Sequence, residues 1–114
     1  MGKNSRLKYG RILLKLSGEA IEGDGTPFDL AAVERIAGEI GGLRNAGAEV
    51  GVVIGGGNIL RGASLSRSGV DRVCSDYMGM LATVMNGLLL ESVMLKKGVP
   101  AVLQSALAVD TVAE

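Results

Sequence analysis

The stretch VVIGGGNILRG, residues 52–62, places three consecutive glycines directly after a run of β-branched residues and then adds an asparagine and an arginine. Glycine allows backbone conformations and close approaches that other residues do not. Three in a row can therefore form a flexible turn or a concave nest of N–H donors for an anion. Arg61, four residues past Gly57, offers a planar clamp for phosphate oxygens. This stretch alone leaves both interpretations open.

The segments around the glycines alternate between strand and helix patterns. Short apolar runs at residues 11–17 and 48–54 predict strands, and residues 100–106 (PAVLQSA) are a third candidate. Between the first two runs, Asp29 is placed to cap a helix that Gly47 ends. The apolar positions of that helix recur every three or four residues: Leu30, Val33, Ile36, Ile40 and Leu43. Residues 72–97 predict a long apolar helix that stops at Gly98.

This order predicts an α/β fold with a parallel sheet and crossover helices. The 114 residues are 47% hydrophobic, which is enough for one packed domain. However, three strands and two helices leave apolar surfaces with nothing to face, and the chain stops without a cap or charged tail. We therefore expect residues 1–114 to be a single partial domain that aggregates when it is produced alone.

Composition excludes several classes of protein. Twelve basic and twelve acidic residues give no net charge, so the overall balance does not favour a nucleic acid or an acidic membrane as partner. One cysteine and no histidine predict no internal disulfide and no zinc cluster, which is typical of a reducing cytoplasm. The absence of histidine also excludes serine–histidine and cysteine–histidine hydrolases.

The segment at residues 78–95 is nearly long and apolar enough to span a membrane. Asn86, Glu91 and Ser92 interrupt it, so we expect a helix buried in a soluble α/β core. Four methionines on this helix are most simply core filling: Met78, Met80, Met85 and Met94.

Two glycine-bearing loops follow the first two predicted strands, KLSG after the first and GGGN after the second. Parallel sheets gather ligands at the carboxyl ends of their strands, so the pairing favours an anion site. Lys15 lies inside the first apolar run, where a lysine is costly unless it reaches the sheet edge, extends to water or meets an anion. Asp71 and Asp76 both lie near the start of the long helix, and local reasoning does not rank them.

Formal nucleotide motifs do not settle the matter. GGGNILRG lacks the Gly-Lys-Ser/Thr of a Walker loop, and the dinucleotide fingerprint would need a glycine where Leu60 stands. Phosphoryl transfer to an acceptor that is already an anion needs no histidine, only positive charge, N–H donors and alignment.

Four stretches, RILLKLSGEA, VGVVIGGGNILRG, DYMGMLATVMNGLLLESV and LQSAL followed by VAE, closely resemble in order and spacing the N-terminal half of the bacterial uridylate (UMP) kinases of the amino acid kinase family. The resemblance covers residues 11–114. It implies a three-layer αβα fold with a mainly parallel sheet, incomplete in this chain. It also implies a cytoplasmic, hexameric enzyme that uses Mg²⁺ with ATP to convert UMP to UDP in pyrimidine nucleotide synthesis.

The resemblance assigns roles residue by residue. Lys15, Ser17 and Gly18 match the ATP-phosphate loop, and Lys15 is the expected catalytic stabiliser of the transferring group. The remaining matched positions are ATP-side contacts at Gly57 and Arg61 and UMP-side contacts at Gly56 and Asp76. Asp76 is thereby preferred to Asp71, and no metal ligand is assigned.

The chain also departs from the family pattern. GDGTPF, residues 23–28, corresponds to a region that takes part in GTP activation in the family. Its sequence is not the usual one, so we do not predict activation by GTP. GTP and UTP are effectors that the resemblance implies. The family's second half, with its adenine pocket and further UMP contacts, is missing, so we expect poor activity from these residues alone. The alternative is a non-catalytic nucleotide-binding or assembly module.

Overall fold

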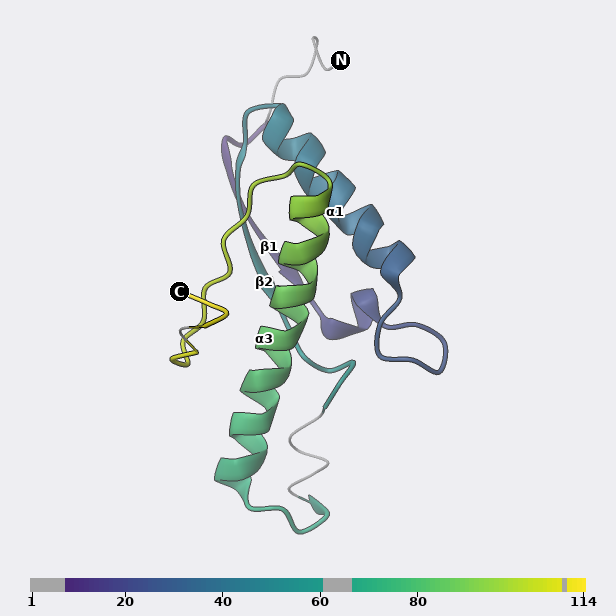
Figure 1. The fold of residues 1–114 in the computed structure, drawn as a ribbon, viewed down its shortest axis with the longest axis vertical. Coiled ribbons are helices and arrows are strands. Elements are labelled where there is room, and N and C mark those ends of the chain that lie inside the picture. The colour runs from purple at the N-terminus through teal and green to yellow at the C-terminus, as the bar shows by residue number, and fades with distance from the viewer. Residues whose placement is uncertain (1–7, 61–66, 110) are drawn as a thin grey trace.

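The computed structural model describes residues 8–60, 67–109 and 111–114. Its elements follow in the order β1 (Arg11–Leu16), a short 3₁₀ helix η1 (Gly18–Ile21), α1 (Leu30–Asn45), β2 (Glu49–Ile54) and α3 (Arg72–Lys96) (Figure 1). The first two predicted strands and both predicted helices are confirmed to within two residues at each end.

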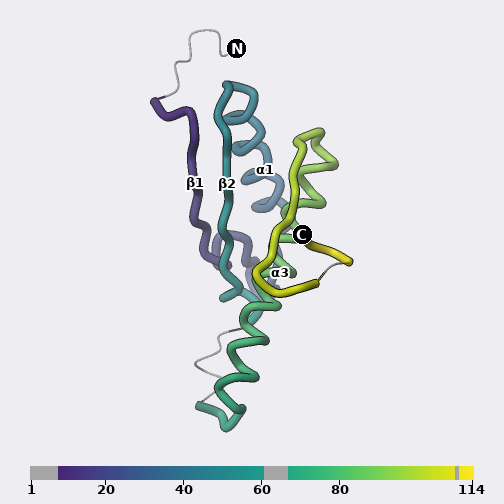
Figure 2. The backbone as a smooth tube through the Cα atoms, turned by 90° about the vertical axis from the view of Figure 1, so that its left-hand side faces the viewer, coloured from purple at the N-terminus to yellow at the C-terminus, as the bar shows by residue number. Residues whose placement is uncertain are grey.

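Strands β1 and β2 form a parallel pair, as predicted, with Arg11 opposite Glu49 and Leu16 opposite Ile54. The two strands run side by side in Figure 2. At the N-terminal ends of the two strands the Arg11 guanidinium lies 2.8 Å from the Glu49 carboxylate. Both side chains are exposed, so this ion pair adds little to the stability of the fold.

Side chains at the helix ends account for the boundaries of the helices. The Asp29 carboxylate accepts hydrogen bonds from the backbone N–H groups of Ala31 and Ala32, which confirms it as the N-cap of α1. Gly47 and Gly98 adopt φ values of 106° and 76° just past the two helices, a region that favours glycine over residues with a Cβ.

The core lies between one face of the sheet and the two helices. Alternate strand residues point inward, and Figure 2 shows α1 and α3 on the same side of β1 and β2. The buried cluster comprises Ile21, Val33, Ile36, Ala37, Ile40, Leu90 and Met94. On the opposite face Leu13 and Val53 are 66% and 52% exposed. Within the described residues the fold therefore has two layers, a small parallel sheet with helices, as expected of an incomplete αβα fold.

Helix α3 is less buried than its sequence suggests. Its C-terminal half buries one residue every four: Ala82, Asn86, Leu90 and Met94. Its N-terminal half extends beyond the sheet in Figure 1. Of the four methionines predicted as core filling, only Met94 is buried, whereas Met78, Met80 and Met85 are 39–51% exposed. The prediction was wrong for these three residues. Met78 and Met80 belong to the half that extends beyond the sheet, where Ser75 is the one buried residue, and Met85 is exposed within the half that packs. By length and composition alone α3 would also pass as a membrane span, although a core helix passes the same test.

The third predicted strand does not form. Residues 100–106 descend beside β2 in Figures 1 and 2, but they have no strand pairing. A cavity of about 800 Å³, lined by both segments, separates them. Their backbone groups bond elsewhere: Leu103 N–H donates to Glu91 Oε2 at 2.9 Å, and Leu103 C=O accepts from Glu114 N–H at 3.0 Å. The strand prediction was wrong here, because a side chain of α3 and the backbone of Glu114 take up the groups of Leu103 that a ladder would use.

Candidate functional site

The two glycine loops meet at the carboxyl edge of the sheet. The parallel ladder continues one residue past the strands, because Gly55 N–H donates to Leu16 C=O at 2.9 Å. Gly18 is buried directly against the second loop. A Cβ at this position would lie 2.7 Å from the nitrogen of Gly57 and 2.8 Å from that of Asn58. The predicted pairing of the loops is therefore a backbone-to-backbone contact that only glycine permits at residue 18.

Backbone donors gather where the loops meet. Within the described part of the chain, the N–H groups of Gly18, Gly57 and Asn58 donate to no acceptor, whereas the next N–H groups, of Ile59 and Leu60, both bond Gly56 C=O. Unpaired N–H groups in a tight turn attract anions, because several partial positive charges point at one place. The arrangement therefore suits a phosphate better than a cation.

Lys15 is positioned by β1 on the outer face of the sheet, away from both helices. It pairs with Val53 in the register, one residue before the strand end. Its side chain is exposed, so the cost of burying a lysine that the sequence raised does not arise in this structure.

Gly56 is in contact with α3. A Cβ on Gly56 would lie 2.8 Å from the Ala82 Cβ and 3.1 Å from the Thr83 nitrogen. The loop therefore lies against the helix backbone, and α3 forms one wall of the site. Ala82 has a small side chain and is 2% exposed, which allows this close approach.

Two asparagines were missed by the sequence reasoning, which treated Asn86 only as an interruption of an apolar helix. Asn86 is fully buried and donates to Asn58 Oδ1 at 2.7 Å, and Asn58 donates to Asn86 Oδ1 at 3.1 Å. The signal available in the sequence was a polar residue on the apolar face of α3, because buried amides require partners.

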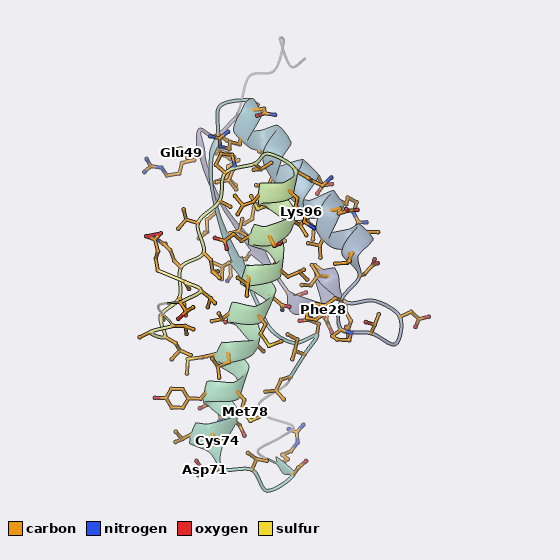
Figure 3. The ribbon with its side chains drawn as sticks, viewed as in Figure 1. Phe28, Glu49, Asp71, Cys74, Met78 and Lys96 are labelled. Carbon is orange, nitrogen blue, oxygen red and sulfur yellow. The ribbon has the colours of Figure 1, made fainter. Side chains whose placement is uncertain are left out.

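The structure separates the two aspartates. Asp71 is the N-cap of α3, with its carboxylate accepting from Cys74 N–H at 3.3 Å. Asp76 lies inside the helix and forms an exposed ion pair with Arg72 at 3.1 Å. Figure 3 shows Asp71 and Cys74 at the end of α3 that is far from Phe28. Asp71 therefore has a structural role as a helix cap, and the assignment of Asp76 as a ligand stays a prediction of the family resemblance.

The other predicted residues are only partly placed. Ser17 precedes η1 as an exposed residue whose hydroxyl makes no capping hydrogen bond. Arg61 lies outside the described residues. The α3 residues in contact with Gly56 are Ala82 and Thr83, which lie six and seven positions after Asp76. The structure thus brings together the loops that carry Ser17, Gly18, Gly56 and Gly57, and Lys15 precedes the first loop on the outer face of β1.

No protein-built metal site is evident in residues 8–60, 67–109 and 111–114, where no three His, Cys, Asp or Glu side chains come together. The donors at the loops are N–H groups and a lysine, which bind anionic oxygens and repel cations. These N–H groups and the lysine therefore do not suit direct coordination of a magnesium ion.

Comparison with known proteins gives a family and close relatives. A sequence model of the amino acid kinase family matches residues 10–113. The uridylate kinase of Histophilus somni is 51% identical over 107 residues, which are 93% of this chain and 45% of that protein. The uridylate kinase of Xanthomonas axonopodis pv. citri is 50% identical over 111 residues, covering 96% of this chain and 46% of that protein. The chain thus spans less than half the length of these relatives.

Solved structures agree with this comparison. The UMP kinase of Bacillus anthracis superposes with a TM-score of 0.85 at 40% identity, over 93% of this chain and 44% of that one. The UMP kinase of Ureaplasma parvum gives the same TM-score at 33% identity, over 92% of this chain and 46% of that one. The arrangement of β1, β2 and the helices is therefore that of the corresponding part of these kinases.

Proposed function

The chain belongs to the amino acid kinase family, and we propose that the protein containing it is a uridylate kinase, which transfers the γ-phosphoryl group of ATP to UMP and yields UDP and ADP. The observation that carries this proposal is the contact between the two glycine loops, where N–H donors without acceptors in the described residues lie at the sheet edge. Lys15 precedes the first of these loops at the end of β1. The choice of UMP as the acceptor rests on the names of the relatives at about 50% identity, which are uridylate kinases.

The donor side of the site is built from β1 and the glycine loops. In this proposal Lys15, Ser17, Gly18, Gly57 and Arg61 bind the ATP phosphates. Phosphoryl transfer spreads negative charge over the equatorial oxygens, and catalysis is mostly alignment and charge stabilisation. The N–H groups of Gly18 and Gly57 supply fixed donors, and the Lys15 ammonium supplies a full charge to the transferring group.

The acceptor side runs along α3. We assign Gly56 and Asp76 to UMP. Asp76 and Thr83 are seven positions apart and so share one face of the helix, separated by about 10 Å along its axis. An elongated ligand is needed to reach both Gly56 and Asp76, and a nucleotide has that shape. The Arg72–Asp76 pair does not prevent this, since exposed ion pairs are weak.

Magnesium enters this proposal with ATP. The described residues offer it no ligand set, so the phosphates themselves would hold the ion and it would offset their charge. In this proposal the chain itself supplies the N–H groups of the glycine loops and the Lys15 ammonium, which bind phosphate oxygens that the metal ion does not coordinate. Activity that falls to background on chelation and returns with MgCl₂ is the expected result.

The remaining assignments are also proposals. We place the protein in the cytoplasm and in pyrimidine nucleotide synthesis, with residues 1–114 as part of one amino acid kinase domain. Assembly into a homohexamer is supported by the exposed apolar side chains on α3, among them Tyr77, Leu81 and Met85. GTP and UTP are the effectors to test first, although residues 23–28 depart from the family sequence.

A coupled assay on the full-length gene product tests the function. We expect ADP formation that requires UMP, and a Lys15→Ala variant with kcat lowered on the order of 10²- to 10³-fold, the range seen when one charge-stabilising donor is removed. An exposed-lysine control, Lys97→Ala, should match the wild type. Equal ADP formation without UMP, or none with any nucleoside monophosphate, would contradict the proposal.

Calorimetric titration separates catalysis from binding alone. If ATP or UMP binds the full-length protein without turnover, a non-catalytic nucleotide-binding module replaces the kinase as the explanation. We expect neither ligand to bind the isolated 114-residue chain with measurable heat, since this chain spans less than half the length of the relatives that it matches.

A further inference from the structure

The paired asparagines beneath the glycine loop also hold two backbone carbonyls. Asn86 donates its second N–H to Gly55 C=O at 2.7 Å, and Asn58 donates its second N–H to Pro27 C=O at 2.8 Å. Because a carbonyl accepts each of these bonds, the orientation of both amides is fixed. Each amide therefore uses both donors and its oxygen inside the protein.

The pair joins segments that are far apart in the sequence. Asn86 is on the buried face of α3, Asn58 follows the three glycines, Gly55 ends the ladder of β2, and Pro27 precedes α1. A Cβ on Gly18 would also clash with Asn58 Oδ1, so the first glycine loop rests on the same amide. One two-residue contact thus sets the distance between α3 and both loops.

Shape alone does not explain an amide pair at this place. Burying polar groups opposes folding unless they are satisfied, and an apolar pair of similar size would pack without that penalty. Hydrogen bonds add direction, however, because they hold the partners at one distance and one angle. The bonds to Gly55 and Asn58 therefore fix the two ends of the segment that carries the free N–H groups.

We propose that Asn58 and Asn86 are positioning residues, which hold the N–H groups of Gly57 and Asn58 against Gly18 in the arrangement that binds the donor phosphates. The inference rests on the proposed function for its substrate. Neither amide needs to touch ATP, since both act through the backbone between them. Displacement of that backbone weakens the phosphate contacts and misaligns the transferring group.

The main test is Asn86→Leu in the full-length gene product, because leucine fills a similar space and makes no hydrogen bond. We expect the KM for ATP to rise at least fivefold and kcat/KM for ATP to fall at least tenfold. A merely structural defect lowers the folded fraction and hence kcat, but leaves this KM unchanged. Leu90→Ala is the matched control, since Leu90 is buried one turn further along α3 and does not contact the loop.

Hydrogen exchange gives a readout that does not depend on activity. In Asn86→Leu the amides of Ile59 and Leu60, which bond Gly56 C=O, should exchange at least tenfold faster, while those within α1 stay within twofold. The Leu90→Ala control should not show this local difference. If Asn86→Leu yields no folded protein, Asn58→Ser is measured in the same way and decides the question.

The outcomes separate the two proposals. A folded variant with the KM for ATP within twofold of wild type overturns the positioning role, as does Leu90→Ala with an equal rise. A wild-type protein that does not phosphorylate UMP overturns the proposed function instead. In that case the exchange rates of Ile59 and Leu60, together with the Kd for ATP by calorimetry, test the asparagine pair alone: unchanged values overturn it and a tenfold change supports it.

Discussion

The two halves of α3 are both rich in apolar residues and have different surroundings. From Ala82 onward, every fourth residue is buried against β2, α1 or the glycine loop. Before Ala82, Ser75 is the one buried residue, and Val73, Tyr77 and Leu81 are 61%, 52% and 46% exposed. Most of the buried residues of α3 therefore lie in its C-terminal half. The comparison shows that apolar composition indicates what a helix can bury and does not show what covers it.

The glycine loop lies at the boundary between these halves. Gly56 contacts Ala82 and Thr83, the first residues of the packed half, and Asn86 holds the loop one turn later. Asp76, the proposed acceptor ligand, belongs to the exposed half. The proposed acceptor side therefore combines a packed wall of α3 at Gly56 with an exposed helical segment at Asp76. Substitutions on α3 should affect stability and local order differently on the two sides of Ala82.

Leu90→Ala should have the largest effect on stability. Leu90 is 5% exposed within the core cluster, and truncating a buried leucine to alanine costs about 2–5 kcal/mol. The free energy of unfolding of the full-length protein, measured with denaturant, checks this value. A loss under about 1 kcal/mol would mean that the packed half of α3 is less tightly held than its burial indicates.

Gly56→Ala should have the next largest effect, because the new Cβ would lie 2.8 Å from that of Ala82. Overpacking of this kind costs about 1–3 kcal/mol. The matched control is Gly79→Ala in the exposed half, where a Cβ meets nothing within 4 Å. Gly79→Ala should instead stabilise α3 by about 0.5–1 kcal/mol, since alanine is the better helix former. Equal signs for the two variants would contradict the contrast between the halves.

Asp71→Ala removes the N-cap of the exposed half. A lost cap costs about 1 kcal/mol of helix stability. Because this half has few tertiary contacts in the described fold, we expect the loss as local fraying of the first turns, seen as faster amide exchange at Cys74 and Ser75. The midpoint of global unfolding should barely change. A global loss of the full amount would indicate that the N-terminal half unfolds together with the core.

Leu81→Ala should have the smallest effect, within about 0.5 kcal/mol, because an exposed leucine loses little when it is truncated. It is the counterpart of Leu90→Ala on the same helix. Denaturant unfolding at low protein concentration isolates the intramolecular effect. A stability loss that appears only at high concentration would indicate that a second copy of the chain covers this half.

Much of the fold could be predicted from local patterns. The Asp29 cap, the Gly47 and Gly98 stops and the strands ending at Leu16 and Ile54 depend on interactions within a few residues, which the sequence displays directly. The pairing of the two glycine loops also followed from the rule that parallel strands end at one edge. The two loops therefore meet where the rule places them, and the site residues named on them stay predictions.

Two features could not be predicted from local patterns. Residues 100–106 have the alternation of a strand, but Glu91 and Glu114 take backbone groups of Leu103 that strand pairing would use. For Lys15 the sequence left open whether the side chain extends to water or meets an anion, and in the described fold it is exposed. Neither outcome is visible in a local pattern, because each depends on what the rest of the chain places beside the segment.

The sequence by itself determined the order of strands and helices, the helix caps and the position of both glycine loops, because these depend on backbone conformation and on neighbours within one or two turns. Only the tertiary structure decided which half of α3 is packed, that Gly18 lies against Gly57, and that Asn58 and Asn86 share their hydrogen bonds. Those features depend on contacts between residues about 30 to 40 positions apart, and such contacts exist only once the chain has brought their surfaces together.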